Sequence, residues 1–309
     1  MNNNLVAAID FGTNTARLLV ADRHPDGSFV HVRLEREIVR MGGGFSREHG
    51  LSADAMERGS GCLGRFSNIL KQYGITNPRA VATSAVRDAL NGPAFLESIR
   101  RQTGIALSII DGEREGALTL AGVIAGLDRQ HDNLMVFDVG GGSTEYTLAH
   151  KGHADFIKSL PLGVVRLTEG KTSPAEMSVK IGKELDLLVG EIKQSGNSVC
   201  TEDTVLVGTA GTATTLAAIN MKMDSYDYRK VNNSLLTLDE IKSIYSMLLP
   251  LSPEERITVP GLEKGREDLI VAGILITVQT MERFGFTVLK VSDYGLLEGL
   301  IAAADPPAL

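Results

Sequence analysis

The sequence of 309 residues contains no tryptophan and only two cysteines, Cys62 and Cys200. Two cysteines are too few for a disulfide framework or a cysteine-rich metal cluster. Long apolar runs are also missing: the uncharged run 269–281 has thirteen residues, whereas a membrane helix needs ~20. No basic segment precedes the first apolar residues, as it would in a secretory signal. These absences predict a soluble, cytoplasmic protein without a membrane partner.

The chain also lacks a net positive charge: its formal net charge at pH 7 is −7. An acidic chain is poorly suited to non-specific nucleic-acid binding, which uses basic patches. The charge is uneven: residues 1–123 carry 14 basic and 13 acidic side chains, and residues 124–309 carry 17 and 25. Thirteen of the first 14 are arginines, whose planar guanidinium suits phosphate or carboxylate. Ordinary surface arginines are the alternative interpretation.

One pattern occurs twice: an apolar strand, Asp-x-Gly, small polar residues and a second apolar strand. The two copies, 6–20 and 134–148, align without a gap at an offset of 128, so Asp10 matches Asp138 and Arg17 matches Glu145. Each copy predicts a β-hairpin. Since a chain of this length fits two domains of ~150 residues, the repeat predicts two similar α/β domains.

The two predicted turns have the composition of an anion-binding site. Glycines let successive backbone N–H groups converge on an anion without a Cβ in the way. An aspartate at the end of the preceding strand, Asp10 or Asp138, can hold Mg²⁺ beside a bound phosphate. A pair of ordinary hairpin turns is the alternative. Two copies in register, the second with Gly-Gly-Gly-Ser-Thr at 140–144, favour phosphate.

The remaining sequence alternates helices and strands, as layered α/β domains do. Periodicity and caps predict helices over 52–74, 93–104, 113–127, 213–220, 237–249, 265–284 and 294–303. Apolar runs predict strands over 80–83, 105–110, 204–207 and 287–292. Residues 208–212 predict a turn that presents N–H groups at a helix start, a second candidate phosphate site. Met56 and Phe66 are expected in the core, and Cys62 in the core or half-buried.

Five further strings narrow the interpretation: 82–91, 137–145, 159–169, 261–268 and 291–296. With the repeated hairpin and residues 208–212, they resemble the Ppx/GppA family of exopolyphosphatases and guanosine pentaphosphate phosphohydrolases, in the actin/Hsp70/sugar-kinase superfamily. The resemblance runs from residue 7 to about residue 300, and it is to the short, two-domain form.

The resemblance implies an α/β fold of two actin-like (ribonuclease H-like) domains facing across a cleft. The first domain would be residues 1–125, with the C-terminal helix, about 296–309, packing back on it, and the second 126–295. The implied reaction is Mg²⁺-dependent hydrolysis that releases terminal phosphate from inorganic polyphosphate, guanosine pentaphosphate, or both. The resemblance leaves a homodimer open.

The resemblance also implies roles for particular residues. Glu115 falls at the position of the catalytic glutamate, where it would take a proton from the attacking water. The expected Mg²⁺ ligands are Asp10, Asp138 and Glu145. The expected phosphate-binding residues are Thr13, Asn14, Arg17, Arg87, Gly140, Gly141, Gly142, Ser143, Gly208, Gly211 and Arg266. Two positions depart from the family pattern: Arg114 stands where many relatives have an acid, and Leu297 where many have an arginine.

Two other functions remain open at this point. A kinase of the same superfamily would transfer phosphate from ATP to a small acceptor, and a non-catalytic sensor would bind polyphosphate or an alarmone without turnover. Phosphate release without an acceptor distinguishes a hydrolase from both. Arg166 fits either the cleft or an ion pair with Glu169. The six histidines are scattered without the spacing of zinc ligands, so zinc is not expected.

Overall fold

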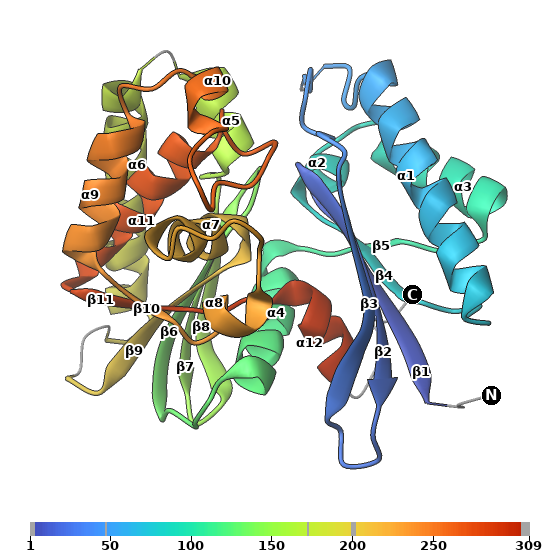
Figure 1. Ribbon diagram of the computed structural model, residues 1–309, viewed down its shortest axis with the longest axis horizontal. Coiled ribbons are helices and arrows are strands. Elements are labelled where there is room, and N and C mark those ends of the chain that lie inside the picture. Colours follow the sequence, from blue (N-terminus) through green and yellow to red (C-terminus); the bar gives the residue numbers. More distant parts are fainter. Residues whose placement is uncertain (1–3, 47, 172, 199–201, 304–309) are drawn as a thin grey trace. The chain divides into compact units, whose positions relative to one another are not determined.

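The computed structural model describes residues 4–46, 48–171, 173–198 and 202–303. Contacts between residues group the chain into two compact units, whose elements are labelled in Figure 1. Unit 1 comprises the described residues up to Ala125 and those from Leu296 on, and unit 2 runs from Gly126 to Gly295. Cys200, and residues 304–309 of the predicted C-terminal helix, lie outside the described residues.

Unit 1 is built on a five-stranded sheet of order β3-β2-β1-β4-β5. Its strands are β1 (Leu5–Phe11), β2 (Thr15–Arg23), β3 (Phe29–Ile38), β4 (Arg79–Ala82) and β5 (Ser108–Ile109). The first three strands are antiparallel, whereas β4 and β5 run parallel to β1. The central strands β1 and β2 are almost continuously apolar because helices cover both faces of the sheet.

The helices of unit 1 form two layers on this sheet (Figure 1). They are α1 (Ala53–Gln72), α2 (Ser84–Arg87), α3 (Gly92–Thr103), α4 (Gly112–Gly126) and α12 (Leu296–Ala302). On one face, α1 and α3 enclose a cluster that includes Phe11 and Phe66. On the other, α4 and α12 enclose a cluster that includes Leu19 and Leu297. Leu297, which stands where many relatives have an arginine, is therefore a fully buried core residue.

Local signals in the sequence predicted α1 and α3 well. The Ser52 side chain accepts a hydrogen bond from the Ala55 amide, and the left-handed Gly104 ends α3 at φ 77°. Cys62 is completely buried, as expected, and burial, followed by the nearby Glu37 carboxylate, raises the pKa of its thiol to about 12. The thiol is therefore uncharged at neutral pH, which suits a core position.

Unit 2 repeats the topology of unit 1. Its six-stranded sheet has the order β10-β11-β9-β6-β7-β8. The strands are β6 (Asn133–Val139), β7 (Thr144–His150), β8 (His153–Leu160), β9 (Thr204–Thr209), β10 (Leu235–Thr237) and β11 (Val288–Val291). Antiparallel β8-β7-β6 continues into parallel β9 and β11, the same order as in unit 1, with β10 added at the edge. The α/β class and the duplication predicted from the sequence are confirmed.

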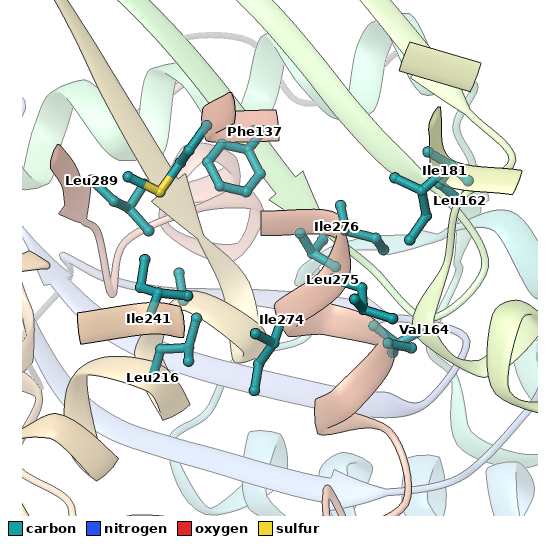
Figure 2. Packing of buried hydrophobic residues seen from close by; sticks show 14 of the residues in the cluster. Phe137, Leu162, Val164, Ile181, Leu216, Ile241, Ile274, Leu275, Ile276 and Leu289 are labelled. Carbon is teal, nitrogen blue, oxygen red and sulfur yellow. The ribbon is translucent and has the colours of Figure 1, made fainter. Parts of the chain in front are cut away.

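The core of unit 2 centres on an apolar helix. The helices are α5 (Val164–Gly170), α6 (Pro174–Gln194), α7 (Ala210–Asn220), α8 (Tyr228–Val231), α9 (Leu238–Leu248), α10 (Pro253–Arg256) and α11 (Ile270–Phe284). Figure 2 shows Ile274 and Ile276 of α11 among side chains from several other elements, including Phe137 of β6 and Ile241 of α9. The predicted capping box of α9, between Thr237 and Glu240, is confirmed.

Three predicted boundaries are wrong. The strand expected over 105–110 is only Ser108–Ile109, because these two residues alone pair with β4. The helix expected over 265–284 begins only at Ile270, and Gly265, left-handed at φ 86°, lies in the loop that precedes it. The turn expected over 208–212 does not exist as such, because β9 continues to Thr209 and α7 begins at Ala210.

Across the described residues, none of the helices combines the length and the hydropathy needed to cross a membrane.

Candidate active site

The two repeated hairpins have the same turn geometry. In unit 1 the Gly12 amide donates to the Thr15 carbonyl at 3.0 Å, and in unit 2 the Gly140 amide donates to the Ser143 carbonyl at 3.0 Å. A Cβ at Gly12 would approach that carbonyl oxygen to 2.9 Å, and one at Gly140 to 3.0 Å. Glycine is therefore required at the same point of both turns. We call residues 12–15 the unit 1 turn and residues 140–143 the unit 2 turn.

The unit 1 turn is fixed by its carbonyls and by one hydroxyl. The Asn14 carbonyl accepts the amides of Val39 and Arg40 at 2.9 Å each. The Thr13 hydroxyl contacts the Ser84 hydroxyl at 2.7 Å and accepts the Ala85 amide at 3.2 Å, which joins the turn to α2. These bonds leave the Thr13 and Asn14 amides without an acceptor among the described residues.

The unit 2 turn is fixed in the same manner by α5. Its Gly140 and Gly141 carbonyls accept the amides of Val164 and Val165 at 3.0 and 2.9 Å. Helix α5 approaches so closely that a Cβ at Gly163 would overlap the Gly141 carbonyl. The amides of residues 141–143 have no acceptor within the described chain. Both turns therefore present backbone donors of the kind that bind anions.

The pairs of residues that flank the two turns differ in charge. In unit 1, Asp10 of β1 lies opposite Arg17 of β2, and both Nε and Nη2 of Arg17 donate to Asp10 Oδ2, at 3.1 and 2.7 Å. In unit 2, Asp138 of β6 lies opposite Glu145 of β7. Both carboxylates are buried, and the Ser159 hydroxyl donates to Glu145 Oε1 at 2.7 Å.

Asp138 and Glu145 fit a divalent cation better than Asp10 does. Like charges directly opposite one another on a sheet repel, and a cation relieves that repulsion. Asp10 already has the Arg17 guanidinium as a counter-charge. The described residues include no group of three or more His, Cys, Asp or Glu side chains arranged to hold a metal. The role of Asp10 as a metal ligand stays a prediction.

Glu115 projects from the first turn of α4 and is only 8% exposed. Its Oε2 lies 3.3 Å from Arg87 Nη1, and the same Arg87 nitrogen donates to the Ile110 carbonyl at 3.0 Å. The structure thus brings together two of the predicted residues from 28 positions apart. Arg114, which stands where many relatives have an acid, is exposed. Glu115 is therefore the buried carboxylate in the first turn of α4.

The start of α7 in unit 2 lies at the same sheet edge as the unit 2 turn, because Thr209 of β9 pairs with Asp138 of β6. Ala210 has a left-handed φ of 60°, a conformation that costs energy for a non-glycine residue and is concentrated at functional sites. Arg266 lies directly over Gly211, where a Cβ would overlap its guanidinium. Arg266 also pairs with Glu263 at 3.0 Å.

Gly208 lies elsewhere than predicted. It is inside β9, and a Cβ there would meet Leu289, Phe137 and Ala213 at 3.1–3.2 Å. This close packing favours glycine at this position, and the role of Gly208 in phosphate binding stays a prediction. Conversely, Ser84 and Ser159, whose hydroxyls contact Thr13 and Glu145, were not singled out from the sequence, although both lie in the strings 82–91 and 159–169.

We expect Gly211→Ala to weaken substrate binding without lowering stability. The added methyl would displace the end of a flexible arginine side chain, while alanine within a helix gains about 0.5–1 kcal/mol over glycine. KM should rise about three- to tenfold, because one charge-assisted contact is misplaced. Gly190→Ala in α6 is the matched control, since a Cβ there meets nothing within 4 Å. Thermal melts and steady-state kinetics on both variants measure the two effects, and equal KM values would contradict the placement of Arg266.

The chain is similar to known proteins over nearly its whole length. A family model described as the Ppx/GppA phosphatase family matches residues 20–306. The bifunctional 3-dehydroquinate synthase/phosphatase of Fusobacterium nucleatum is 33% identical over 97% of this chain and 46% of that protein. Exopolyphosphatase 2 of Mycobacterium tuberculosis is 30% identical over 96% of this chain and 97% of that protein. The guanosine-5'-triphosphate,3'-diphosphate pyrophosphatase of Vibrio cholerae is 28% identical over 97% and 59%.

The chain therefore spans about half the length of two of these relatives and nearly all of the third.

Two solved structures resemble the fold. The Aquifex aeolicus member of the Ppx/GppA family has a TM-score of 0.80 at 31% identity, with 96% of each chain covered. An exopolyphosphatase from Cytophaga hutchinsonii has a TM-score of 0.87 at 26% identity, again with 96% of each chain covered. The predicted actin-like fold class is confirmed by these structures.

Proposed function

Because the chain belongs to the Ppx/GppA phosphatase family, we propose that it removes the terminal phosphate from inorganic polyphosphate, guanosine pentaphosphate, or both. Water attacks the terminal phosphorus, the bridging P–O bond breaks, and the products are inorganic phosphate and a chain one phosphate shorter. The observation that carries this proposal is the pair of matched turns, each with unused backbone amides beside charged side chains. Relatives named as an exopolyphosphatase and as a guanosine-5'-triphosphate,3'-diphosphate pyrophosphatase support the substrate class.

The turns are proposed to bind the phosphates. Phosphoryl transfer depends mainly on positioning and on neutralising the non-bridging oxygens. The amides of Thr13 and Asn14 in unit 1, and those of residues 141–143 in unit 2, supply donors at positions fixed by neighbouring elements. Arg17 and Arg266 add guanidinium groups whose planar geometry matches phosphate. Charge neutralisation thus comes from local donors, in a chain whose net charge would repel a polyanion.

Glu115 is proposed to act as the general base. Its buried carboxylate would accept a proton from the attacking water, and the adjacent Arg87 holds that carboxylate in one orientation. The bond from Arg87 to the Ile110 carbonyl fixes the arginine itself. Glu115 and Arg87 are therefore proposed to act together, with Arg87 positioning the base.

Asp138 and Glu145 would hold Mg²⁺, whose chemistry when bound is to neutralise charge on the phosphate oxygens. Their buried, opposed carboxylates are the donors that Mg²⁺ prefers, and Ser159 fixes one of them.

Asp138→Asn is expected to raise the Mg²⁺ concentration needed for half-maximal rate, because an amide is a weaker ligand than a carboxylate. An effect of about tenfold or more is expected, because changes even to the hydrogen-bond partners of metal ligands lower metal affinity about 10- to 100-fold. Asp155→Asn, on the exposed part of β8, should leave the Mg²⁺ dependence unchanged. Direct Mg²⁺ binding by calorimetry gives a readout that does not depend on activity. Identical titrations for the two variants, or full activity in excess chelator, would contradict this metal site.

The proposed reaction is tested by measuring inorganic phosphate released from long polyphosphate, tripolyphosphate and guanosine pentaphosphate with Mg²⁺ and no other acceptor. Release from at least one substrate supports the hydrolase. Phosphate transfer from ATP that requires an added acceptor would instead show a kinase. Tight binding of all three substrates without turnover would show a sensor.

A further inference from the structure

Unit 2 contains a cavity that is separate from its turn. The cavity measures about 670 Å³, and all of its lining residues belong to unit 2. They include Thr204 and Val288, the first residues of β9 and β11. The unit 2 turn follows the carboxyl end of β6, which runs parallel to β9. The cavity therefore lies at the other end of these strands, and its size is typical of sites for small organic ligands.

Three nitrogen-bearing side chains line the cavity: Arg129, His131 and Lys290. Lys290 is only 7% exposed, and its ammonium lies 2.8 Å from the carboxylate of Asp128. The Nε2 atom of His131 is buried and has no hydrogen-bond partner among the described residues. Arg129 is exposed and forms no salt bridge with a residue that the structure describes. A buried nitrogen without a partner indicates that a polar group from outside the chain can be bound here.

The electrostatic field at His131 is positive in spite of Asp128. Burial lowers the pKa of His131, and the Arg129 guanidinium and the Lys290 ammonium lower it further. The Asp128 carboxylate raises that pKa, with a smaller effect than either cation. Glu202, the other carboxylate of the lining, is exposed. An anion beside His131 would therefore be attracted by the two cations.

The cavity also has an apolar wall. Lys290 of β11 lies directly opposite Leu235 of β10, so both project from the face of the sheet that turns away from the core residue Leu289. Val288, two residues before Lys290, shares this face. Leu235 is 62% exposed and Val288 41% exposed, and both line the cavity. A ligand with an apolar body would remove these side chains from water, which favours binding.

Asn233 fixes the segment that carries the cations. Its Nδ2 donates to the Gly126 carbonyl at 2.9 Å, and its Oδ1 accepts the Asp128 amide at 3.2 Å. These bonds hold the chain next to Arg129 in place before a ligand arrives. A wall that is already ordered lowers the entropic cost of binding.

We propose that this cavity is a second ligand site, which binds a small phosphate monoester with an apolar or aromatic body. A phosphate monoester has three acceptor oxygens and close to two negative charges at neutral pH. It therefore matches the three donor groups of Arg129, His131 and Lys290 better than a carboxylate, which has two oxygens. The proposal does not depend on the proposed hydrolysis, because the cavity lies away from the turns and its test is a binding measurement.

The test follows the imidazole resonances of the full chain by NMR during titration with phenyl phosphate in the absence of Mg²⁺. The resonance of His131, identified by its loss in His131→Gln, should shift at phenyl phosphate concentrations below about 1 mM. Arg129→Gln and Lys290→Met should each raise Kd about tenfold, as expected for loss of a charge-assisted hydrogen bond. Lys193→Met, at an exposed position of α6 outside the cavity, is the matched control and should bind like the wild type. Arg129 is exposed, so its variant should fold normally even if Lys290→Met does not.

Two further probes test the ligand class. Inorganic phosphate lacks the apolar body and benzoate lacks the third oxygen, so each should bind about tenfold more weakly than phenyl phosphate. Equal binding of either probe would overturn the assigned class. The site itself would be refuted if the His131 resonance stays unchanged up to about 10 mM, or if Arg129→Gln and Lys193→Met give the same Kd. A response that disappears in Arg266→Ala would place the probe at the candidate active site and would also contradict the proposal.

Discussion

Glu115→Gln is expected to lower kcat by about 10²- to 10⁴-fold, the usual contribution of a general base. Glutamine has nearly the same shape as glutamate and can still contact Arg87, 3.3 Å away, so the fold and the binding site should persist. The amide cannot accept the proton of the attacking water. Stopped or steady-state phosphate release, with the thermal melting temperature as a check of folding, measures the effect.

The matched control is Glu113→Gln, which removes an exposed carboxylate from the same helical turn. It should retain wild-type kcat within about twofold. If Glu115→Gln keeps more than about half of the wild-type kcat, the base has been misassigned. Loss of even a weak general base lowers kcat by much more than about twofold.

Arg266→Ala is expected to lower kcat/KM by about 10- to 150-fold, the range for a charge-assisted hydrogen bond to phosphate. The Arg266 guanidinium lies over the start of α7 and is held there by Glu263, so it needs little rearrangement to meet a ligand. Its loss should weaken binding and slow turnover together. Kinetics on long polyphosphate, with a binding measurement in the absence of Mg²⁺, separate the two contributions.

Arg229→Ala is the control for this prediction. The Arg229 side chain is exposed and stacks on Tyr228, with its guanidinium carbon 5.6 Å from the ring centroid. Its removal should change kcat/KM little. Small and equal effects of the two substitutions would show that Arg266 does not face the substrate.

Local features of the fold could be predicted from the sequence because they depend on neighbouring residues. The caps of α1 and α9, and the two hairpins, involve contacts within a few positions of the chain. The strands β3 and β8 were not predicted. Both are edge strands with exposed or half-buried charged residues, so they lack the continuous apolar run of β1 or β6. Helix α6 was also missed, although its buried residues Ile181, Leu185 and Leu188 follow helical spacing.

The site was predictable in its residue types and not in its contacts. The repeat placed Arg17 in register with Glu145, and the family resemblance selected Glu115 and Arg266. The contacts that give these residues their surroundings join distant segments: Arg87 with Glu115, and Arg266 with Gly211. The pairing of β2 with β3 was likewise not specified by any periodicity in the sequence.

The most direct test of the central claim is to follow long-chain polyphosphate by ³¹P NMR during incubation with the wild-type protein and Mg²⁺. Removal of terminal phosphates predicts that the orthophosphate signal grows as the signal of internal phosphates falls, and that Glu115→Gln abolishes this change. A spectrum that stays unchanged with polyphosphate and, in a second sample, with guanosine pentaphosphate would contradict the account, as would internal cleavage into shorter chains without orthophosphate.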